Sequence, residues 1–101
     1  VVIAAEEYPA NQYPWLNLRD RGVEVRTVPS RGNRVDVADV RAAMTDRTRV
    51  LSASFVQFAS GFRADLDALG ELCRGRGVFF FVDAIQGLGV FPLDVQRTPI
   101  D

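Results

Sequence analysis

The sequence predicts an α/β fold with a mostly parallel sheet, and two observations support this. Short apolar runs alternate with amphipathic stretches along the whole chain, which is typical of repeated strand–helix–strand units. The run at residues 78–82 is apolar throughout, as expected for a central strand that is covered on both faces. Parallel neighbours require crossover connections, and the stretches between the runs are long enough to supply them.

Four runs are predicted to be strands. The second of them alternates polar and apolar residues with period two, which indicates a strand with one solvated face, near an edge of the sheet. In chain order the predicted strands cover residues 1–5, 23–28, 48–55 and 78–82.

Two helices are predicted between the first three strands. The first covers residues 11–21, with Pro14 in its first turn and Gly22 after its end, where a residue tolerant of positive φ is favoured. The second covers residues 37–44, and Asp36 is a good N-cap for it.

A third helix is predicted at residues 64–76, closed by Gly77 before the last strand. Its apolar residues recur at helical spacing and include Cys73, which we therefore interpret as a core cysteine and not as a nucleophile. The apolar stripe consists of Leu66, Leu69, Leu72 and Cys73.

Composition restricts the possible functions. A chain of 101 residues forms one domain at most, and its 48% apolar content is ample for a core. The net charge of −1 does not indicate nucleic acid or an anionic membrane as a partner. The single cysteine excludes an internal disulfide and favours a reducing compartment such as the cytoplasm. Without histidine, the chain has no imidazole for acid–base catalysis or for a metal site, so we predict no metal.

Both ends of the chain look cut, and the basic residues are unusual. The sequence starts within an apparent strand and stops soon after Pro99, so we expect a fragment of a larger protein. All 12 basic residues are arginine, so the chain has no lysine amine with which to form a Schiff base.

Polar residues follow three of the predicted strands. Because the loops after parallel strands emerge at the same edge of a sheet, these residues should share one rim and form a ligand site. Asp83 is the most informative of them, since it directly follows a wholly apolar run. The alternative for Asp83 is a cap on the following turn or helix. The expected rim residues are Glu7, Asn11, Ser54, Gln57, Asp83 and Gln86.

The stretch Asp83-Ala84-Ile85-Gln86 resembles the Asp-x-x-Gln element of fold-type I pyridoxal-phosphate (PLP) enzymes, specifically the class V aminotransferase and cysteine desulfurase group. This resemblance implies that Asp83 pairs with the protonated pyridine nitrogen of the cofactor. It also implies that Gln86 donates a hydrogen bond to the phenolic oxygen and that Ile85 packs under the ring. Plain core packing is the alternative for Ile85.

The segment from Glu7 to Trp15 resembles the family's Glu-His-His-Ala-Asn-x-x-Pro-Trp segment, with matches at Glu7, Ala10, Asn11, Pro14 and Trp15. Tyr8 occupies the position of the histidine that stacks on the pyridine ring, and its aromatic ring can also stack. The departure removes an ionisable group and weakens the resemblance to the desulfurases in particular. The alternative for Tyr8 is a loop aromatic that packs on the next helix.

Two further stretches fit the same family. Ser54-Phe55-Val56-Gln57 resembles its His-Val-Ser-Asn stretch, which implies a cofactor or substrate contact for Gln57; a solvated loop residue is the alternative. Leu93-Asp94-Val95 follows Pro92, as in the family's Pro-x-Asp-Val.

The resemblance covers essentially the whole chain. It implies the central part of the three-layer α-β-α large domain of a PLP-dependent transferase, without its phosphate-binding loop and Schiff-base lysine. The chain alone would then contain no catalytic residue and would be inactive. The parent enzyme would be a homodimer acting on an amino acid by transamination, desulfuration, elimination or epimerisation, and the isolated fragment could self-associate.

The alternative from another class is a self-contained flavodoxin-like or receiver-like α/β module that binds a ligand or partner without catalysis. A receiver domain, however, would need a cluster of acidic residues at strand ends together with a lysine, and this chain has no lysine.

Overall fold

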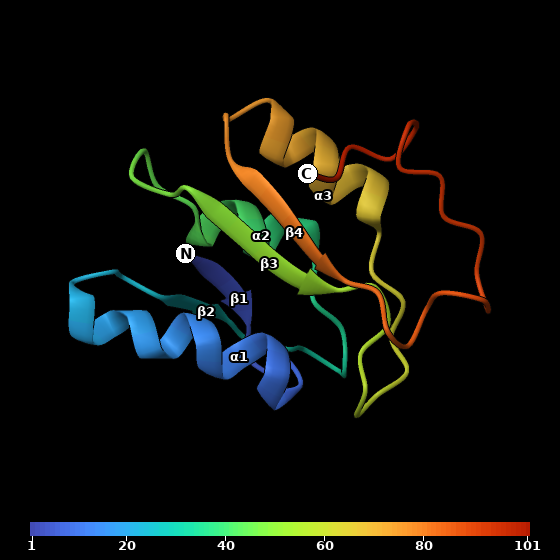
Figure 1. The fold of residues 1–101 in the computed structure, drawn as a ribbon, viewed down its shortest axis with the longest axis horizontal. Helices are drawn as coiled ribbons and strands as arrows, with labels where there is room; N and C mark the ends of the chain where they lie inside the picture. The colour runs from blue at the N-terminus through green and yellow to red at the C-terminus, as the bar shows by residue number, and fades with distance from the viewer.

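The computed structural model describes all residues from 1 to 101, which form a four-stranded sheet with helices on both faces (Figure 1). The sheet order is β2-β1-β3-β4, and every neighbouring pair is parallel. The predicted parallel α/β fold is therefore confirmed. The strands are β1 (Val2–Ala4), β2 (Arg26–Val28), β3 (Val50–Ser54) and β4 (Phe79–Asp83).

The helices make the fold three-layered, as predicted. In Figure 1, α1 lies on one face of the sheet, and α2 and α3 lie on the other. Successive side chains of a strand point to opposite faces. Leu51 of β3 accordingly joins the core beside α2 and α3, whereas the next residue, Ser52, bonds to Asn11 of α1. The helices are α1 (Pro9–Leu16), the 3-10 helix η1 (Asn17–Arg21), α2 (Val37–Ala43) and α3 (Leu66–Arg74).

The main core lies between the sheet and the pair α2 and α3. Its most buried members include Val2, Leu51 and Phe80, each at most 1% exposed. The predicted stripe of α3 is buried in full. This helix begins at Leu66 and not at residue 64, because the side chain of Asp65 accepts a hydrogen bond from the Ala68 amide at 3.0 Å and caps it there.

The first helix begins two residues earlier than predicted. Pro9 occupies its first turn, where the fixed φ of proline suits a helix start. Pro14 then lies inside α1 and not in its first turn, so it cannot donate the usual bond to the carbonyl of Ala10. The helix continues as η1 and ends at Gly22, with a φ of +81°, as predicted.

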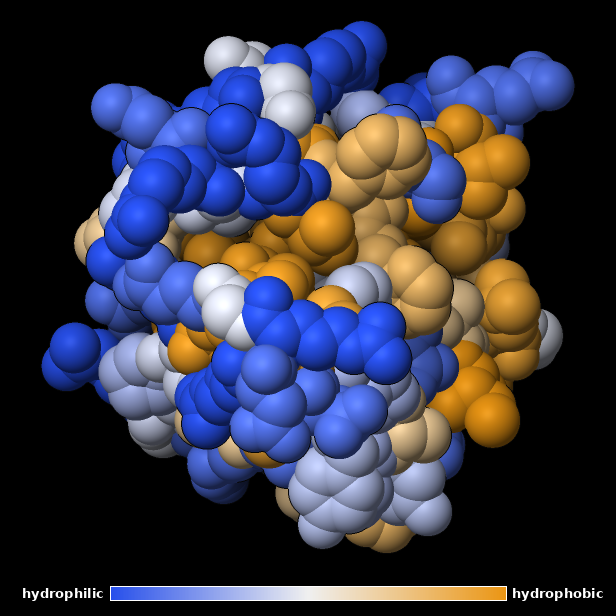
Figure 2. All heavy atoms as spheres, turned by 60° about the vertical axis from the view of Figure 1, so that its left-hand side comes forward, coloured by the Kyte–Doolittle hydropathy of each residue, from blue (hydrophilic) through white to orange (hydrophobic).

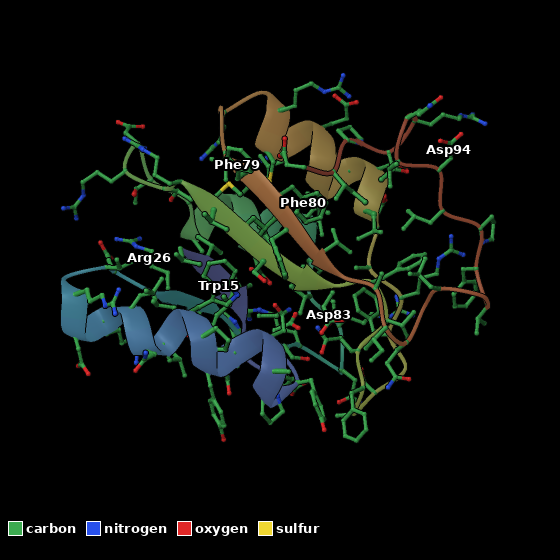
Figure 3. All side chains as sticks on the ribbon, viewed as in Figure 1. Trp15, Arg26, Phe79, Phe80, Asp83 and Asp94 are labelled. Carbon is green, nitrogen blue, oxygen red and sulfur yellow. The ribbon has the colours of Figure 1, made fainter.

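The prediction of a central last strand is wrong for this chain, because β4 forms one edge of the sheet. Phe79 and Phe81 are 65% and 49% exposed, since α1 covers this face only in part. Trp15 of α1 is labelled in Figure 3, and the centroid of its ring lies 5.6 Å from that of Phe81. The outer edge of β4 is contacted by Asp101, whose amide donates to the Phe80 carbonyl at 3.2 Å. Figure 2 shows apolar side chains gathered on one side of the molecule.

At the opposite edge, β2 is shorter than predicted and pairs with β1 alone. Asp36 occupies the N-cap position of α2, but its side chain makes no capping hydrogen bond. None of the helices has the length and apolar character needed to cross a membrane.

Candidate functional site

A pocket of about 200 Å³ opens at the carboxyl ends of the strands. Figure 3 shows Asp83 at this end of β4, close to the beginning of α1. Three separate segments that follow strands supply its walls, as expected for the ligand edge of a parallel sheet. Its lining residues are Tyr8, Ala10, Ser54, Val56, Phe58, Asp83, Ile85 and Gln86.

One carboxylate oxygen of Asp83 is hydrogen-bonded within the chain, and the other is not. It is the last residue of β4 and lies opposite Ser54 in the strand register. Its Oδ1 accepts a hydrogen bond from the Ile85 amide at 3.1 Å, while Oδ2 makes no hydrogen bond within the chain. The capping alternative is thus correct for Oδ1. Asp83 as a residue is half-buried, and its Oδ2 remains free to meet a ligand in the pocket.

A tight turn after β4 carries the next two pocket residues. The amides of Gly87 and Leu88 both donate to the Ala84 carbonyl at 2.9 Å. Gly87 packs so closely on Phe55 that a Cβ atom there would lie 2.2 Å from the ring, so only glycine fits. The turn leaves Gln86 exposed with its side-chain amide unbonded, and leaves Ile85 79% exposed. Within this chain Ile85 is therefore not packed in the core.

Two aromatic rings form another wall of the pocket. Tyr8, which precedes α1, and Phe58, in the loop after β3, meet edge to face with ring centroids 5.0 Å apart. Tyr8 is 46% exposed, so its ring is accessible from the pocket. Phe58 is not among the residues predicted from the sequence; the available signal was a bulky aromatic in a loop directly after a strand.

A buried hydrogen-bond network adjoins the pocket and is centred on Glu7, which is 5% exposed. Its Oε1 accepts from the Ser54 amide at 3.0 Å and from Gln57 Nε2 at 2.8 Å. Its Oε2 accepts from Asn11 Nδ2 at 2.8 Å and from the Ser54 hydroxyl. Asn11 Oδ1 in turn accepts from Ser52 Oγ at 2.6 Å. Four expected rim residues are thus bonded to one another beside the pocket.

Gln57 is not brought to the pocket. It is 5% exposed, and its amide nitrogen is directed to Glu7. Its Oε1 is buried without a hydrogen-bond partner, and the residue lines a separate interior cavity of about 20 Å³. The solvated-loop alternative is therefore wrong, and a cofactor contact for Gln57 stays a prediction.

Cys73 has no part in the site. It lies on the buried face of α3, and this burial, aided by Asp101, raises the pKa of its thiol to about 11. A thiol with such a pKa is a poor nucleophile at neutral pH.

The pocket residues match the chemistry of a flat, protonated heteroaromatic ring. The free oxygen of Asp83 supplies an anion for a ring N–H, Gln86 supplies an amide donor, and Tyr8 supplies an aromatic face. A pyridoxal ring needs these three kinds of group, so the residues present fit it. The binding roles of Asp83, Gln86, Tyr8 and Ile85 stay predictions.

Solved structures share this fold. Cysteine desulfurase CsdA from Escherichia coli superposes with a TM-score of 0.91 and 30% identity, over 99% of this chain and 26% of that one. A C-DES mutant with glycine covalently linked to its PLP cofactor matches with a TM-score of 0.88 and 24% identity, over 99% and 28%. The fold is that of part of a PLP-dependent transferase.

The family follows from the sequence comparison. The Aminotransferase class-V family model matches residues 1–101, and the chain belongs to this family of PLP-dependent enzymes, as predicted. Cysteine desulfurase IscS of Shewanella frigidimarina is 35% identical, and a probable cysteine desulfurase of Methanothermobacter thermautotrophicus is 33% identical, both over 102 residues. The chain is covered in full in both cases and spans 25% and 26% of these relatives.

Proposed function

We propose that this chain is part of the cofactor-binding domain of a PLP-dependent enzyme that acts on an amino acid. The observation that carries the proposal is the free carboxylate oxygen of Asp83 in a pocket shared with Gln86 and Tyr8. Asp83 would hold the proton on the pyridine nitrogen, Gln86 would bond the phenolic oxygen, and Tyr8 would cover one ring face. When bound, the cofactor supplies an electron sink for the carbanion of an amino-acid substrate.

The reaction is proposed at the level of its class. The two relatives named above are cysteine desulfurases, which favours chemistry on a sulfur-containing amino acid. Tyr8 has a phenol where the family's segment has an imidazole, so the ionisable ring of that histidine is absent. Proton transfer at this position is therefore not assigned to Tyr8, and transamination, elimination and epimerisation remain open.

We further propose that the chain alone is inactive, because it contains no lysine to hold the cofactor covalently.

The intact enzyme is proposed to be a homodimer in a reducing compartment, the cytoplasm. The exposed rings of Phe79 and Phe81 and the free, buried thiol of Cys73 support these two statements. Light scattering of the purified enzyme would test the dimer.

The test of the proposal is Asp83→Asn in the full protein that carries this segment. Asparagine keeps the Oδ1 acceptor for the Ile85 amide but removes the charge, so the turn stays intact. We expect turnover to fall by about 10²-fold or more, as for loss of other electrostatic groups in active sites, together with weaker retention of PLP. Asp20→Asn is the matched control, since Asp20 is exposed and makes no side-chain hydrogen bond. Near-normal turnover of Asp83→Asn would contradict the proposal.

A further inference from the structure

Glu7 is a buried carboxylate without a cationic partner. The ion pairs of the chain all involve other residues. An isolated buried carboxylate is costly, so its charge must be balanced by hydrogen-bond donors. Glu7 has four of them, two on each oxygen, from Ser54, Gln57 and Asn11. These four hydrogen bonds should hold the donor residues firmly in place, because bonds to an ionised group are shorter and stronger than bonds between neutral groups.

These bonds join the segments that carry the pocket residues. Glu7 directly precedes Tyr8, whose ring lines the pocket. Ser54, which gives Glu7 both its amide and its hydroxyl, lies opposite Asp83 in the register of β3 and β4. The carboxylate therefore connects the turn that carries Tyr8 with the strand end beside Asp83.

The Tyr8 turn has few other attachments. Tyr8 occupies the N-cap position of α1 without a side-chain capping bond, and its carbonyl accepts from the Asn11 amide at 2.8 Å within the same helix. The nearby bond from Gln12 Nε2 to the Ala5 carbonyl is exposed and 3.2 Å long. Neither bond reaches β3, and the Ala5 amide bonds only to the Val28 carbonyl at the end of β2, at 2.9 Å. The polar bonds from this region that do reach β3 are those of Glu7 and the bond from Ser52 to Asn11, which is itself a partner of Glu7. The remaining contact of Tyr8 is its edge-to-face packing on Phe58.

We propose that Glu7 is a positioning residue of the pocket: its buried carboxylate fixes the Tyr8 ring relative to Asp83. Glu7 does not line the pocket, so it acts through Tyr8 and Ser54. The identity of the ligand rests on the function proposed above, whereas the link between the turn and β3 does not.

The test compares Glu7→Gln with Glu6→Gln in the full protein that carries this segment. Glutamine is nearly isosteric with glutamate, but its NH₂ group opposes one pair of donors in the network. Glu6 is the adjacent, exposed glutamate and makes no side-chain hydrogen bond, so it is the matched control. The measurements are amide hydrogen exchange at Ser54 and Tyr8, the dissociation constant for PLP, and the visible circular dichroism of bound PLP.

We expect Glu7→Gln to speed exchange at the Ser54 amide, to weaken PLP binding by about tenfold, as for loss of one charged hydrogen bond, and to reduce the visible dichroism. Glu6→Gln should match the wild type in all three. Equal exchange, affinity and dichroism in the two variants would overturn the proposal. So would a Glu7→Gln variant that only melts at a lower temperature while its cofactor signals stay unchanged.

Gln57→Met keeps the test decisive if Glu7→Gln does not fold. It removes one donor from Glu7 Oε1 and leaves the other three in place. It should change the same signals in the same direction by a smaller amount, and wild-type values would overturn the proposal. The proposed function and the proposed role of Glu7 are overturned by different results. Normal turnover of Asp83→Asn would contradict the proposed function, whereas the exchange rates of the Ser54 and Tyr8 amides would still test the role of Glu7.

Discussion

Ser54 and Asp83 lie opposite each other at the ends of β3 and β4, and the Phe55 amide continues the pairing by donating to the Asp83 carbonyl at 2.8 Å. Ser54 bonds to Glu7, while Asp83 contributes its carboxylate to the pocket. Shifting one strand by a single residue would turn its side chains to the other face of the sheet. The register of these two strands therefore determines the geometry of the site.

Asn11→Ala should lower the free energy of unfolding by about 2–4 kcal/mol, because it removes buried volume and leaves Glu7 and Ser52 without one partner each. Urea unfolding of the purified protein measures this. Asn17→Ala is the control, since Asn17 is exposed and should change stability by no more than about 0.5 kcal/mol. Equal midpoints for the two variants would show that the network does not stabilise the fold.

Gly87→Ala should destabilise the turn that presents Gln86. The added Cβ would lie 2.2 Å from Cδ1 of Phe55, so the ring or the turn must move, at a cost of about 1–3 kcal/mol. Gly75→Ala is the control: its φ is −64°, and its Cβ would meet the carbonyl oxygens of Glu71 at 3.3 Å and Leu72 at 3.8 Å. Combining Gly87→Ala with Phe55→Leu should recover part of the loss in thermal unfolding. A Gly87→Ala protein as stable as Gly75→Ala would contradict the predicted clash.

The local sequence pattern predicts the helices and strands of this fold well. It predicts less well which elements and side chains lie next to one another. The strands and the buried stripe of α3 follow from periodicity, which depends on neighbouring residues. The network around Glu7 does not, because its bonds to Ser54 and Gln57 join residues 47 and 50 positions apart. The exposure of Phe79 has the same origin, since an apolar run does not reveal which elements will lie beside it.

Two aspartates at helix starts should differ in their effect on stability. Asp65 Oδ1 accepts from the Ala68 amide at 3.0 Å, whereas Asp36 makes no such bond. We expect Asp65→Ala to lower the free energy of unfolding by about 1 kcal/mol and Asp36→Ala to change it by a few tenths at most. Chemical denaturation of both variants measures the difference. A larger loss for Asp36→Ala would favour the sequence-based prediction that Asp36 caps α2.

Cys73 should make stability decline in alkaline solution. Its pKa is about 11 in the folded chain, raised by burial from an ordinary value of 9.0. Folding therefore favours the protonated thiol, and this contribution is fully present below about pH 9 and is lost as the pH rises towards 11. At neutral pH the native thiol should react slowly with a thiol reagent and quickly after unfolding.

Cys73→Ala isolates this effect, because the other groups that titrate at alkaline pH, including the two tyrosines, remain in both proteins. The variant loses buried atoms and should melt at a lower temperature than the wild type at neutral pH. The advantage of the wild type should then shrink between about pH 9 and 11, as its unfolded chain gains stability from ionising the thiol. Melting curves of both proteins across this range measure the difference. A constant advantage would mean that the thiol has the same pKa in the folded and unfolded chains.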